Sequence, residues 1–208
     1  MAISFNQQKG SAQKSSVSSF QYKDGDNVMR ICGDILARYV YWIKGENDKN
    51  IPLECLSFDR NAEAFTNQEK DWVREYYPDL KCGWSYATQC IDNGEVKVVN
   101  LKKKLWESII SAAEDLGDPT DPVTGWDIKF KRVKTGPLPY NVEYQLQALK
   151  CKPSPLNAED TALVADIKSM DEVMSRPTPD AQKELLDRIR QAHTSEVDDT
   201  LEAEFNVG

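Results

Sequence analysis

The sequence predicts a mainly β protein with helices: an OB-fold-like, five-stranded Greek-key barrel followed by C-terminal helices and a disordered acidic tail. Two observations lead to this prediction. Before residue 150, several short β-type segments surround one clear helix, which is the pattern of a small, partly open barrel. At residues 152–155 the sequence Lys-Pro-Ser-Pro ends that pattern, and helix-forming and acidic residues follow. A generic α+β sandwich is the alternative architecture.

Strands are predicted where apolar and polar residues alternate, or where β-branched and aromatic residues cluster. These segments are residues 27–31, 35–43, 52–58, 81–91, 96–101, 126–133 and 140–149. Asp92-Asn93-Gly94 is a strong hairpin signal between two of them. The other connections, at residues 45–50, 118–122 and 135–139, are rich in turn-forming residues.

Helices are predicted from the spacing of apolar residues and from their caps. Residues 102–116 carry Leu105, Ile109, Ala112 and Leu116 on one face and end at Gly117. Three further helices are predicted, two of them with an N-cap residue at the start. They are residues 67–77 (N-cap Asn67, stop at Pro78), residues 157–174 (start at Asn157) and residues 178–193 (N-cap Thr178, then Pro179).

Charge and aromatic residues are distributed unevenly along the 208-residue chain. Residues 1–152 contain 21 basic and 21 acidic side chains, whereas residues 153–208 contain 5 and 13, so the net charge of -8 lies in the C-terminal part. Of 19 aromatic residues, only Phe205 lies beyond Tyr144. We therefore expect four segments: a flexible N-terminal arm (1–20), an OB-fold domain (21–152), a helical segment (153–193) and an acidic tail (194–208).

Few residues are suited to catalysis or to metal binding. His193 is the only histidine and ends a predicted helix, where a solvated side chain is the simpler interpretation, because catalysis needs a positioned partner. The five cysteines form no CxxC pair and are interpreted as reduced, mostly buried thiols. Asp118 and Asp121 lie in a proline-rich segment that indicates an exposed turn. We expect no enzymatic activity, no cofactor and no metal site.

Basic side chains predict binding of a polyanion. Lys102, Lys103 and Lys104 open the predicted helix, where cations oppose the helix dipole and an anionic partner would offset the repulsion. Further cations lie on predicted strands: Lys129, Lys131, Arg132 and Lys134 at one edge of the barrel, and Arg30, Arg38, Lys44, Lys81 and Lys97 on the strand surface. Neutralisation of phosphates by such residues supplies most of the sequence-independent affinity for nucleic acid. The alternative is that these basic side chains only belong to solvated turns and strand faces and bind no polyanion.

Aromatic residues accompany these cations. Within residues 36–43 rings occupy both faces of the predicted strand, Tyr39 and Tyr41 against Trp42, so one face is core and the other displays rings. Each base stacked on a ring gains about 1–3 kcal/mol. The predicted ring contacts to DNA are Tyr39, Tyr41, Trp84, Tyr86 and Tyr140, whereas Trp106 and Trp126 are assigned to the core.

The acidic tail resembles a polyanion in composition. It is expected to compete weakly with DNA for the basic surface and to bind partner proteins, with Phe205 as an anchor. The predicted partner-binding residues are Asp198, Asp199, Glu202, Glu204 and Phe205. The alternative is that the tail only increases the solubility of the protein.

Residues 84–110 resemble the helix-destabilising, single-stranded DNA-binding proteins of tailed phages, of the T-even type. A Trp- and Tyr-bearing strand leads through a turn to Val-Lys-Val-Val-Asn-Leu at 96–101, and Lys-Lys-Lys-Leu-Trp-Glu-Ser-Ile at 102–109 is similar to the start of the family's helix. Residues 25–31, residues 126–134 and the acidic C-terminus are also similar. The resemblance spans residues 20–150 and the character of the tail.

The resemblance implies a protein that coats and protects single strands without sequence preference in phage DNA replication, recombination and repair, in the cytoplasm of the infected bacterial host. The tail would contact replication and recombination proteins, and no membrane is involved. Two departures are clear. Where the family binds zinc this chain offers only Cys55 and no histidine, and its N-terminal arm has only Lys9 and Lys14, so self-association on DNA should be weak.

Two alternatives stay open at the level of sequence. One is an RNA-binding regulator on the same barrel, since the 2′-hydroxyl that separates RNA from DNA is recognised by contacts that sequence does not reveal. The other is an adaptor protein that recruits partners through its tail helices and binds no nucleic acid.

Overall fold

The computed structural model describes residues 18–47, 49–138 and 140–205, with side chains described as far as Thr194 in the last helix. The fold is mainly β with several helices, which confirms the coarse fold prediction. Most of the predicted N-terminal arm lies outside the described residues. Its last residues, Ser18 to Phe20, belong to the folded structure, and Phe20 is buried.

The strands form one large sheet and one short hairpin. The strands of the large sheet are β1 (Ser18–Ser19), β2 (Gly25–Lys44), β3 (Asn50–Glu54), β6 (Gly83–Asp92), β7 (Glu95–Leu101), β8 (Ile128–Lys134) and β9 (Val142–Leu146). Their order is β1-β7-β6-β2-β8-β9, and β3 also pairs with β2. The separate hairpin consists of β4 (Phe58–Asp59) and β5 (Ala64–Phe65).

Two helices lie between strands along the chain, and the others follow the last strand. The helices are α1 (Trp72–Tyr76), α2 (Lys103–Leu116), the 3-10 turn η1 (Ala148–Lys150), α3 (Ala158–Ala165), α4 (Met170–Val173) and α5 (Pro179–Phe205). The prediction of α2 is confirmed: Leu105 and Ile109 are buried, and the Gly117 amide donates to the Ala113 carbonyl at a positive φ of 82°.

The chain divides into two compact units whose sequences are interleaved. Unit 1 comprises Met1–Asp34, Thr88–Asn100 and Lys104–Val173, and unit 2 comprises Ile35–Ala87, Leu101–Lys103 and Met174–Gly208. The long strands β2 and β6 each contribute to both units. Of the predicted C-terminal helical segment, α3 and α4 belong to unit 1 and α5 belongs to unit 2.

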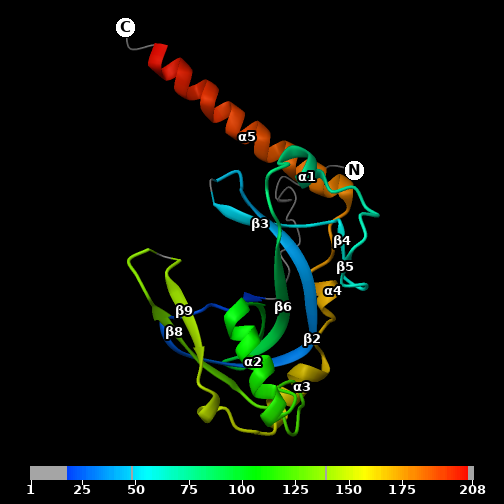
Figure 1. Ribbon diagram of the computed structural model, residues 1–208, viewed down its shortest axis with the longest axis vertical. Coiled ribbons are helices and arrows are strands. Elements are labelled where there is room, and N and C mark those ends of the chain that lie inside the picture. The colour runs from blue at the N-terminus through cyan, green and yellow to red at the C-terminus, as the bar shows by residue number, and fades with distance from the viewer. Residues whose placement is uncertain (1–17, 48, 139, 206–208) are drawn as a thin grey trace, which may run out of the picture. The chain divides into compact units, whose positions relative to one another are not determined.

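Strand β2 is continuous where the sequence predicted two strands. Gly33 was expected to interrupt it, but this glycine adopts a φ of +78°, which lets the strand bend without ending. Figure 1 shows β2 as one long curved strand. A Cβ atom at Gly33 would lie 2.8 Å from the Ile167 side chain, so this position requires glycine for packing as well.

In unit 1 the segment before β2 contacts strands on two sides. The Phe20 amide donates to the Val98 carbonyl of β7 (2.8 Å). The Tyr22 hydroxyl donates to the Asn100 carbonyl of β7 (2.9 Å), while its ring lies 5.0 Å from that of Tyr144 on β9. The segment therefore joins β7 to the β8–β9 hairpin by ring contacts and hydrogen bonds.

In unit 2 the helices α1 and α5 pack on one face of β2 and β3. Their buried core consists of Tyr41, Ile43, Leu53, Cys55, Phe58, Val73, Leu186 and Ile189. Figure 1 shows α1 beside the first turns of α5, and the Tyr76 hydroxyl donates to the Asp187 carboxylate across this contact (2.7 Å).

A buried carboxylate joins this core to the segment that precedes α5. The Arg176 guanidinium binds Glu54 (3.4 Å) and the carbonyls of Leu56 and Phe58 (2.8 Å each). The same Glu54 accepts two hydrogen bonds from Arg60 (2.7 and 2.6 Å).

Three helix boundaries differ from the prediction. Helix α1 begins after Asp71 rather than Asn67, because the Asp71 carboxylate accepts the Val73 amide and the Tyr41 hydroxyl. The segment predicted as one helix at 157–174 is two, α3 and α4. Between them Ile167 packs on Gly33, and Gln89 binds the Lys168 carbonyl (2.6 Å).

The tail differs from the prediction as well. Helix α5 begins at Pro179 with Thr178 as its cap, as predicted, but it continues to Phe205, where disorder was expected. The sequence of α5 after Pro179 contains neither Gly nor Pro and is rich in Ala, Leu and Glu, which favour helix.

Candidate nucleic-acid interface

The β8–β9 hairpin presents its cations on two different faces. Ile128 and Phe130 of β8 are fully buried, so Lys129 and Lys131, which alternate with them, point away from the core. Arg132 and Lys134 lie on the same face of β8 as Ile128 and Phe130, but beyond the end of the buried core. The four cations therefore do not form the single charged edge that the sequence suggested.

Rings accompany the second pair of cations. Arg132 is the cross-strand neighbour of Tyr144 on β9, and directly opposed residues share a face of the sheet. The Tyr144 ring contacts that of Tyr22 (centroids 5.0 Å apart). We call Arg132, Lys134, Tyr22 and Tyr144 the hairpin surface. Sequence reasoning missed both tyrosines, because only the fold brings residue 22 to β9.

The loop between β8 and β9 adds an exposed ring. Tyr140 is 74 % exposed and Leu138 is 46 % exposed. The loop is closed by hydrogen bonds from the Thr135 amide to the Asn141 carbonyl (2.9 Å) and from the Asn141 amide to the Leu138 carbonyl (3.0 Å). An exposed aromatic ring of this kind is a suitable platform for a base.

Arg30, Lys97 and Lys104 are predicted cations of unit 1 that lie close to protein partners. Arg30 is 5 % exposed, and its guanidinium binds the carbonyls of Asp121 (2.8 Å) and Ser154 (3.1 Å), so it fixes two loops and is not a surface cation as predicted. Lys97 is paired with Asp92 (2.8 Å) and Glu95 (3.5 Å). The hydrogen bond to Asp92 raises the pKa of Lys97 above its ordinary value. Lys104 is 79 % exposed, 3.9 Å from Glu143.

Unit 2 carries a second group of rings and cations. Trp84 and Tyr86 of β6 lie with ring centroids 4.6 Å apart, and the Lys103 ammonium lies 5.9 Å from the centroid of Trp84. We call Trp84, Tyr86 and Lys103 the tryptophan surface. The two rings are half-buried, and Lys81, Lys102 and Lys103 are exposed. The sequence predicted these rings and these lysines as separate features, and the structure brings Lys103 to Trp84.

The structure also decides which face of β2 displays its ring. Trp42 is 59 % exposed, with the exposed Lys44 two residues further along the same face. Tyr41 is 2 % exposed and belongs to the core, where its hydroxyl donates to Asp71 (3.1 Å). Tyr39 is half-buried against Phe58 and Phe65 (4.8 Å each). The prediction of Tyr41 as a displayed ring is therefore wrong, and Trp42 is the displayed one.

Arg38 is also placed differently from the prediction. It is 9 % exposed and lies on a buried stretch of β2. Burial lowers the pKa of its guanidinium, and the charge of Glu54 partly offsets that shift. Its charge therefore acts inside unit 2 rather than on the surface.

Three of the described thiols are poorly suited to nucleophilic chemistry. Burial raises the pKa of Cys32 to about 11 and that of Cys55 and Cys90 to about 12, so these thiols are protonated at neutral pH. Within residues 18–194, apart from residues 48 and 139, no group of three or more His, Cys, Asp or Glu side chains is arranged to hold a metal ion. His193 is half-buried, with Nε2 3.1 Å from the Gly45 carbonyl oxygen.

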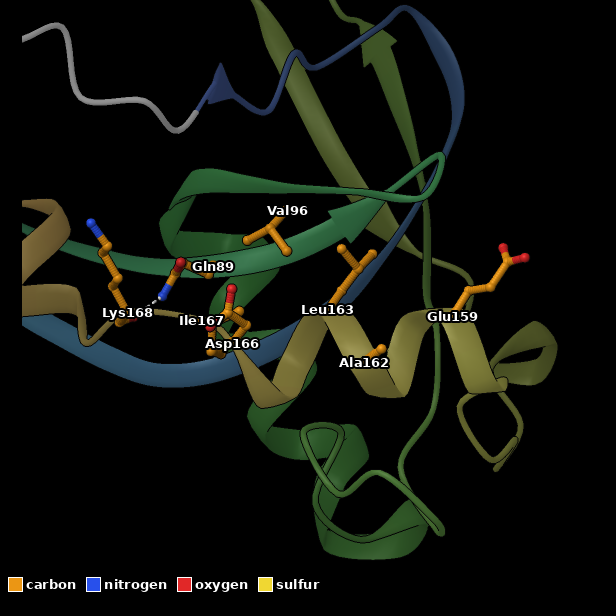
Figure 2. A pocket seen from close by; sticks show the side chains of 8 residues that line it. All are labelled: Gln89, Val96, Glu159, Ala162, Leu163, Asp166, Ile167 and Lys168. Carbon is orange, nitrogen blue, oxygen red and sulfur yellow. Dashed lines mark hydrogen bonds between the residues drawn. The ribbon is translucent and has the colours of Figure 1, made fainter.

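Unit 1 contains a pocket of about 390 Å³ between α3 and the strands β6 and β7. Figure 2 shows the lining residues Val96, Ala162, Leu163, Asp166 and Ile167, with Glu159 toward one end of the group and Lys168 toward the other. The Gln89 amide nitrogen donates to the Lys168 carbonyl (2.6 Å), the dashed line in Figure 2. The lining suits an apolar side chain better than a phosphate.

Other predictions concern the C-terminus and membranes. The predicted partner-binding side chains at 198–205 lie outside the described side chains. Among the described residues, no helix combines the length and apolar character that a bilayer-spanning segment requires.

The structure thus defines a mainly β protein that presents rings beside cations in each of its two units. No protein-family model matches the sequence. The chain is 24 % identical to a protein of Escherichia phage T5 named "Probable ssDNA-binding protein". The alignment is 248 positions long and covers 100 % of this chain and 94 % of the phage protein.

Proposed function

We propose that this protein binds single-stranded DNA without sequence preference and coats and protects it in phage DNA replication, recombination and repair. The observation that carries the proposal is the tryptophan surface, where a cation and two rings lie together on a strand and at the start of a helix. Rings stack on bases of any identity, and cations neutralise phosphates, so the combination gives affinity without base-edge recognition. The name of the phage T5 relative supports the same conclusion.

The strand order supports an OB-like barrel as the framework. The path β7-β6-β2-β8-β9, with α2 between β7 and β8, is that of five Greek-key strands in which β2, β6, β7, β8 and β9 are the first to fifth. OB folds bind oligonucleotides on their second and third strands and on the loops after the first and fourth. Trp84 and Tyr86 lie on the second strand, Trp42 near the end of the first, and Tyr140 in the loop after the fourth.

We propose contacts to DNA in each unit. In unit 1 they are Lys104, Lys129, Lys131, Arg132, Lys134 and Tyr140, with Tyr22 and Tyr144 added. In unit 2 they are Trp42, Lys44, Lys81, Trp84, Tyr86, Lys102 and Lys103. Tyr39 is a weaker candidate because half of its surface is covered.

No chemical step is required for this function. A protein that binds the single strand and not the duplex shifts the equilibrium toward the open strand by mass action.

The same proposal includes kinship with T-even-type proteins, based on residues 84–110. It also includes a location in the cytoplasm of the infected host and weak self-association on DNA.

The test is a fluorescence titration of the full chain with oligo-dT, a duplex of equal length, oligo-dU and oligo-rU, at two salt concentrations. We expect oligo-dT to quench tryptophan emission and to bind far more tightly than duplex, with affinity falling steeply as salt rises. Equal affinity for duplex and single strand would refute the proposal. A preference for oligo-rU over oligo-dU would instead favour an RNA-binding regulator.

A role of the acidic C-terminus is tested separately. We propose that residues 194–208 compete with DNA and bind replication and recombination proteins. A chain ending at His193 should bind oligo-dT more tightly at low salt and no longer bind those proteins. Unchanged DNA affinity would leave the tail without the competitive role.

A further inference from the structure

The backbone around Asp24 is fixed by a buried side chain. Asn27 is 7 % exposed, and its amide nitrogen donates to the carbonyls of Lys23 (2.8 Å) and Gly25 (2.9 Å). Its amide oxygen accepts from the Lys23 backbone amide (3.0 Å). Gly25 has a φ of +86°, a conformation that favours glycine, so the chain turns sharply just after Asp24.

This turn places the Asp24 carboxylate on the cations of the hairpin surface. Gly25 is the cross-strand neighbour of Arg132 in the β2–β8 pairing. Asp24 Oδ1 accepts a hydrogen bond from Arg132 Nη1, and Asp24 Oδ2 lies 3.5 Å from Lys134 Nζ. One carboxylate therefore pairs with both cations. The Arg132 side chain is only 19 % exposed, so its charge is partly shielded from solvent.

The pairing bears directly on phosphate binding. A carboxylate and a phosphate oxygen use the same N–H donors of an arginine, so they compete for them. Arg132 Nε is buried and has no hydrogen-bond partner among the described residues, which leaves its Nη groups as the donors that an incoming ligand can reach.

We propose that Asp24 is a built-in competitor of the DNA phosphate on the hairpin surface, and that its displacement limits the affinity for single strands. This inference rests on the proposed function, because it names the residue that regulates the same surface. When a strand binds, its phosphate replaces the Asp24 carboxylate at Arg132 and Lys134. Binding therefore gains less free energy than it would at two cations that have no carboxylate partner. The strand is also released faster, because Asp24 stays beside both cations.

The test compares Asp24→Asn with Asp79→Asn in oligo-dT titrations of the full chain. Both variants remove one negative charge without changing side-chain size. Asp79 is exposed, belongs to unit 2 and forms no ion pair among the described residues. We expect Asp24→Asn to bind about threefold to tenfold more tightly at low salt, and Asp79→Asn to change little. The slope of log K against log salt should steepen by about 0.7 for each cation that then neutralises a phosphate.

A double-mutant cycle tests the specific pairing. In an Arg132→Met background, Asp24→Asn should give a smaller gain, because only Lys134 remains to be released. A urea denaturation midpoint for each variant confirms that the fold is retained.

Each outcome decides the inference. Unchanged or weaker binding of Asp24→Asn would overturn it, and weaker binding would show that Asp24 holds Arg132 in place for DNA. An equal gain in oligo-dT affinity for Asp79→Asn would show that the effect comes from net charge alone, and this would also overturn the inference. Failure of the wild-type chain to bind oligo-dT would refute the proposed function itself, which is a distinguishable result.

Discussion

The ammonium nitrogen of Lys103 lies 5.9 Å from the centre of the Trp84 ring. Lys103 is the first residue of α2 and Trp84 the second residue of β6, so the contact joins a helix start to a strand. A cation over a ring is a modest attraction at an exposed site, about 0.5–1 kcal/mol. Under the proposed function, this contact keeps a positive charge near the ring on which a base would stack.

Trp84→Ala should therefore weaken binding to oligo-dT by about 1–3 kcal/mol, the usual loss for one stacked base. Trp84→Phe keeps an aromatic face and should retain most of the affinity. Fluorescence anisotropy of labelled oligo-dT measures both variants. Full affinity in the alanine variant would remove Trp84 from the interface.

The two faces of β2 predict opposite phenotypes for neighbouring residues. Trp42→Ala should weaken DNA binding with little effect on stability, because the side chain is 59 % exposed. Tyr41→Phe should leave DNA binding intact and lower the free energy of unfolding by about 1 kcal/mol, since it removes the hydroxyl that donates to Asp71 (3.1 Å). Urea denaturation and oligo-dT titration of each variant separate the two effects. A binding defect in Tyr41→Phe would contradict the assignment.

Salt dependence should distinguish two lysines of unit 1. Lys134 is 66 % exposed and lies 3.5 Å from Asp24, so the comparison is made in the Asp24→Asn background, where Lys134 is released. There Lys134→Met should lower the slope of log K against log salt by about 0.7. Lys97→Met is the matched control, because Lys97 is already neutralised by Asp92 and Glu95. Titrations at four or more salt concentrations give both slopes. Equal losses in the two variants would mean that pairing within the protein does not decide which lysines reach DNA.

Arg176 should matter for stability rather than for binding. Arg176→Met leaves the carbonyls of Leu56 and Phe58 without their donor and removes a charge partner from the buried Glu54. We expect the free energy of unfolding to fall by about 2–4 kcal/mol. Arg188→Met is the control, since Arg188 is 59 % exposed and its pair with Glu46 should contribute less than about 1 kcal/mol. Similar unfolding midpoints for the two variants would contradict this account.

The buried thiols should resist alkylation in the folded protein. Burial raises the pKa of Cys32 to about 11 and that of Cys90 to about 12, and the reactive species is the thiolate. At pH 8 both should stay unmodified by iodoacetamide, and their reactivity should rise only above pH 9, whereas urea should expose all five cysteines of the chain. Mass spectrometry after a timed reaction identifies the modified residues. Rapid modification of Cys90 at pH 8 would show that this strand opens readily.

Local signals predicted much of the fold. Helix α2, the turn at Asp92-Asn93-Gly94, the helix start at Asn157 and the cap at Thr178 all depend on interactions within a few residues, so the sequence reveals them directly. The contact of Lys103 with Trp84 was not predicted, although both residues were singled out, because it depends on how β6 and the start of α2 pack.

Longer-range packing decided the rest. Gly33 bends β2 instead of ending it because Ile167 packs against it, and Asp71 rather than Asn67 caps α1 because Tyr41 donates to it. The sequence showed that β2 has rings on both faces, but only the position of α1 and α5 made Tyr41 the buried one and Trp42 the exposed one.

The sequence by itself therefore determined the mainly β character, the main helix and the presence of cations beside rings, because these follow from composition and short-range pattern. Only the tertiary structure decided which cations are already paired. Asp24 and Arg132 are 108 residues apart in sequence, and no periodic pattern links them. Their contact exists because β2 and β8 are neighbours in the sheet, and strand pairing is a property of the whole fold.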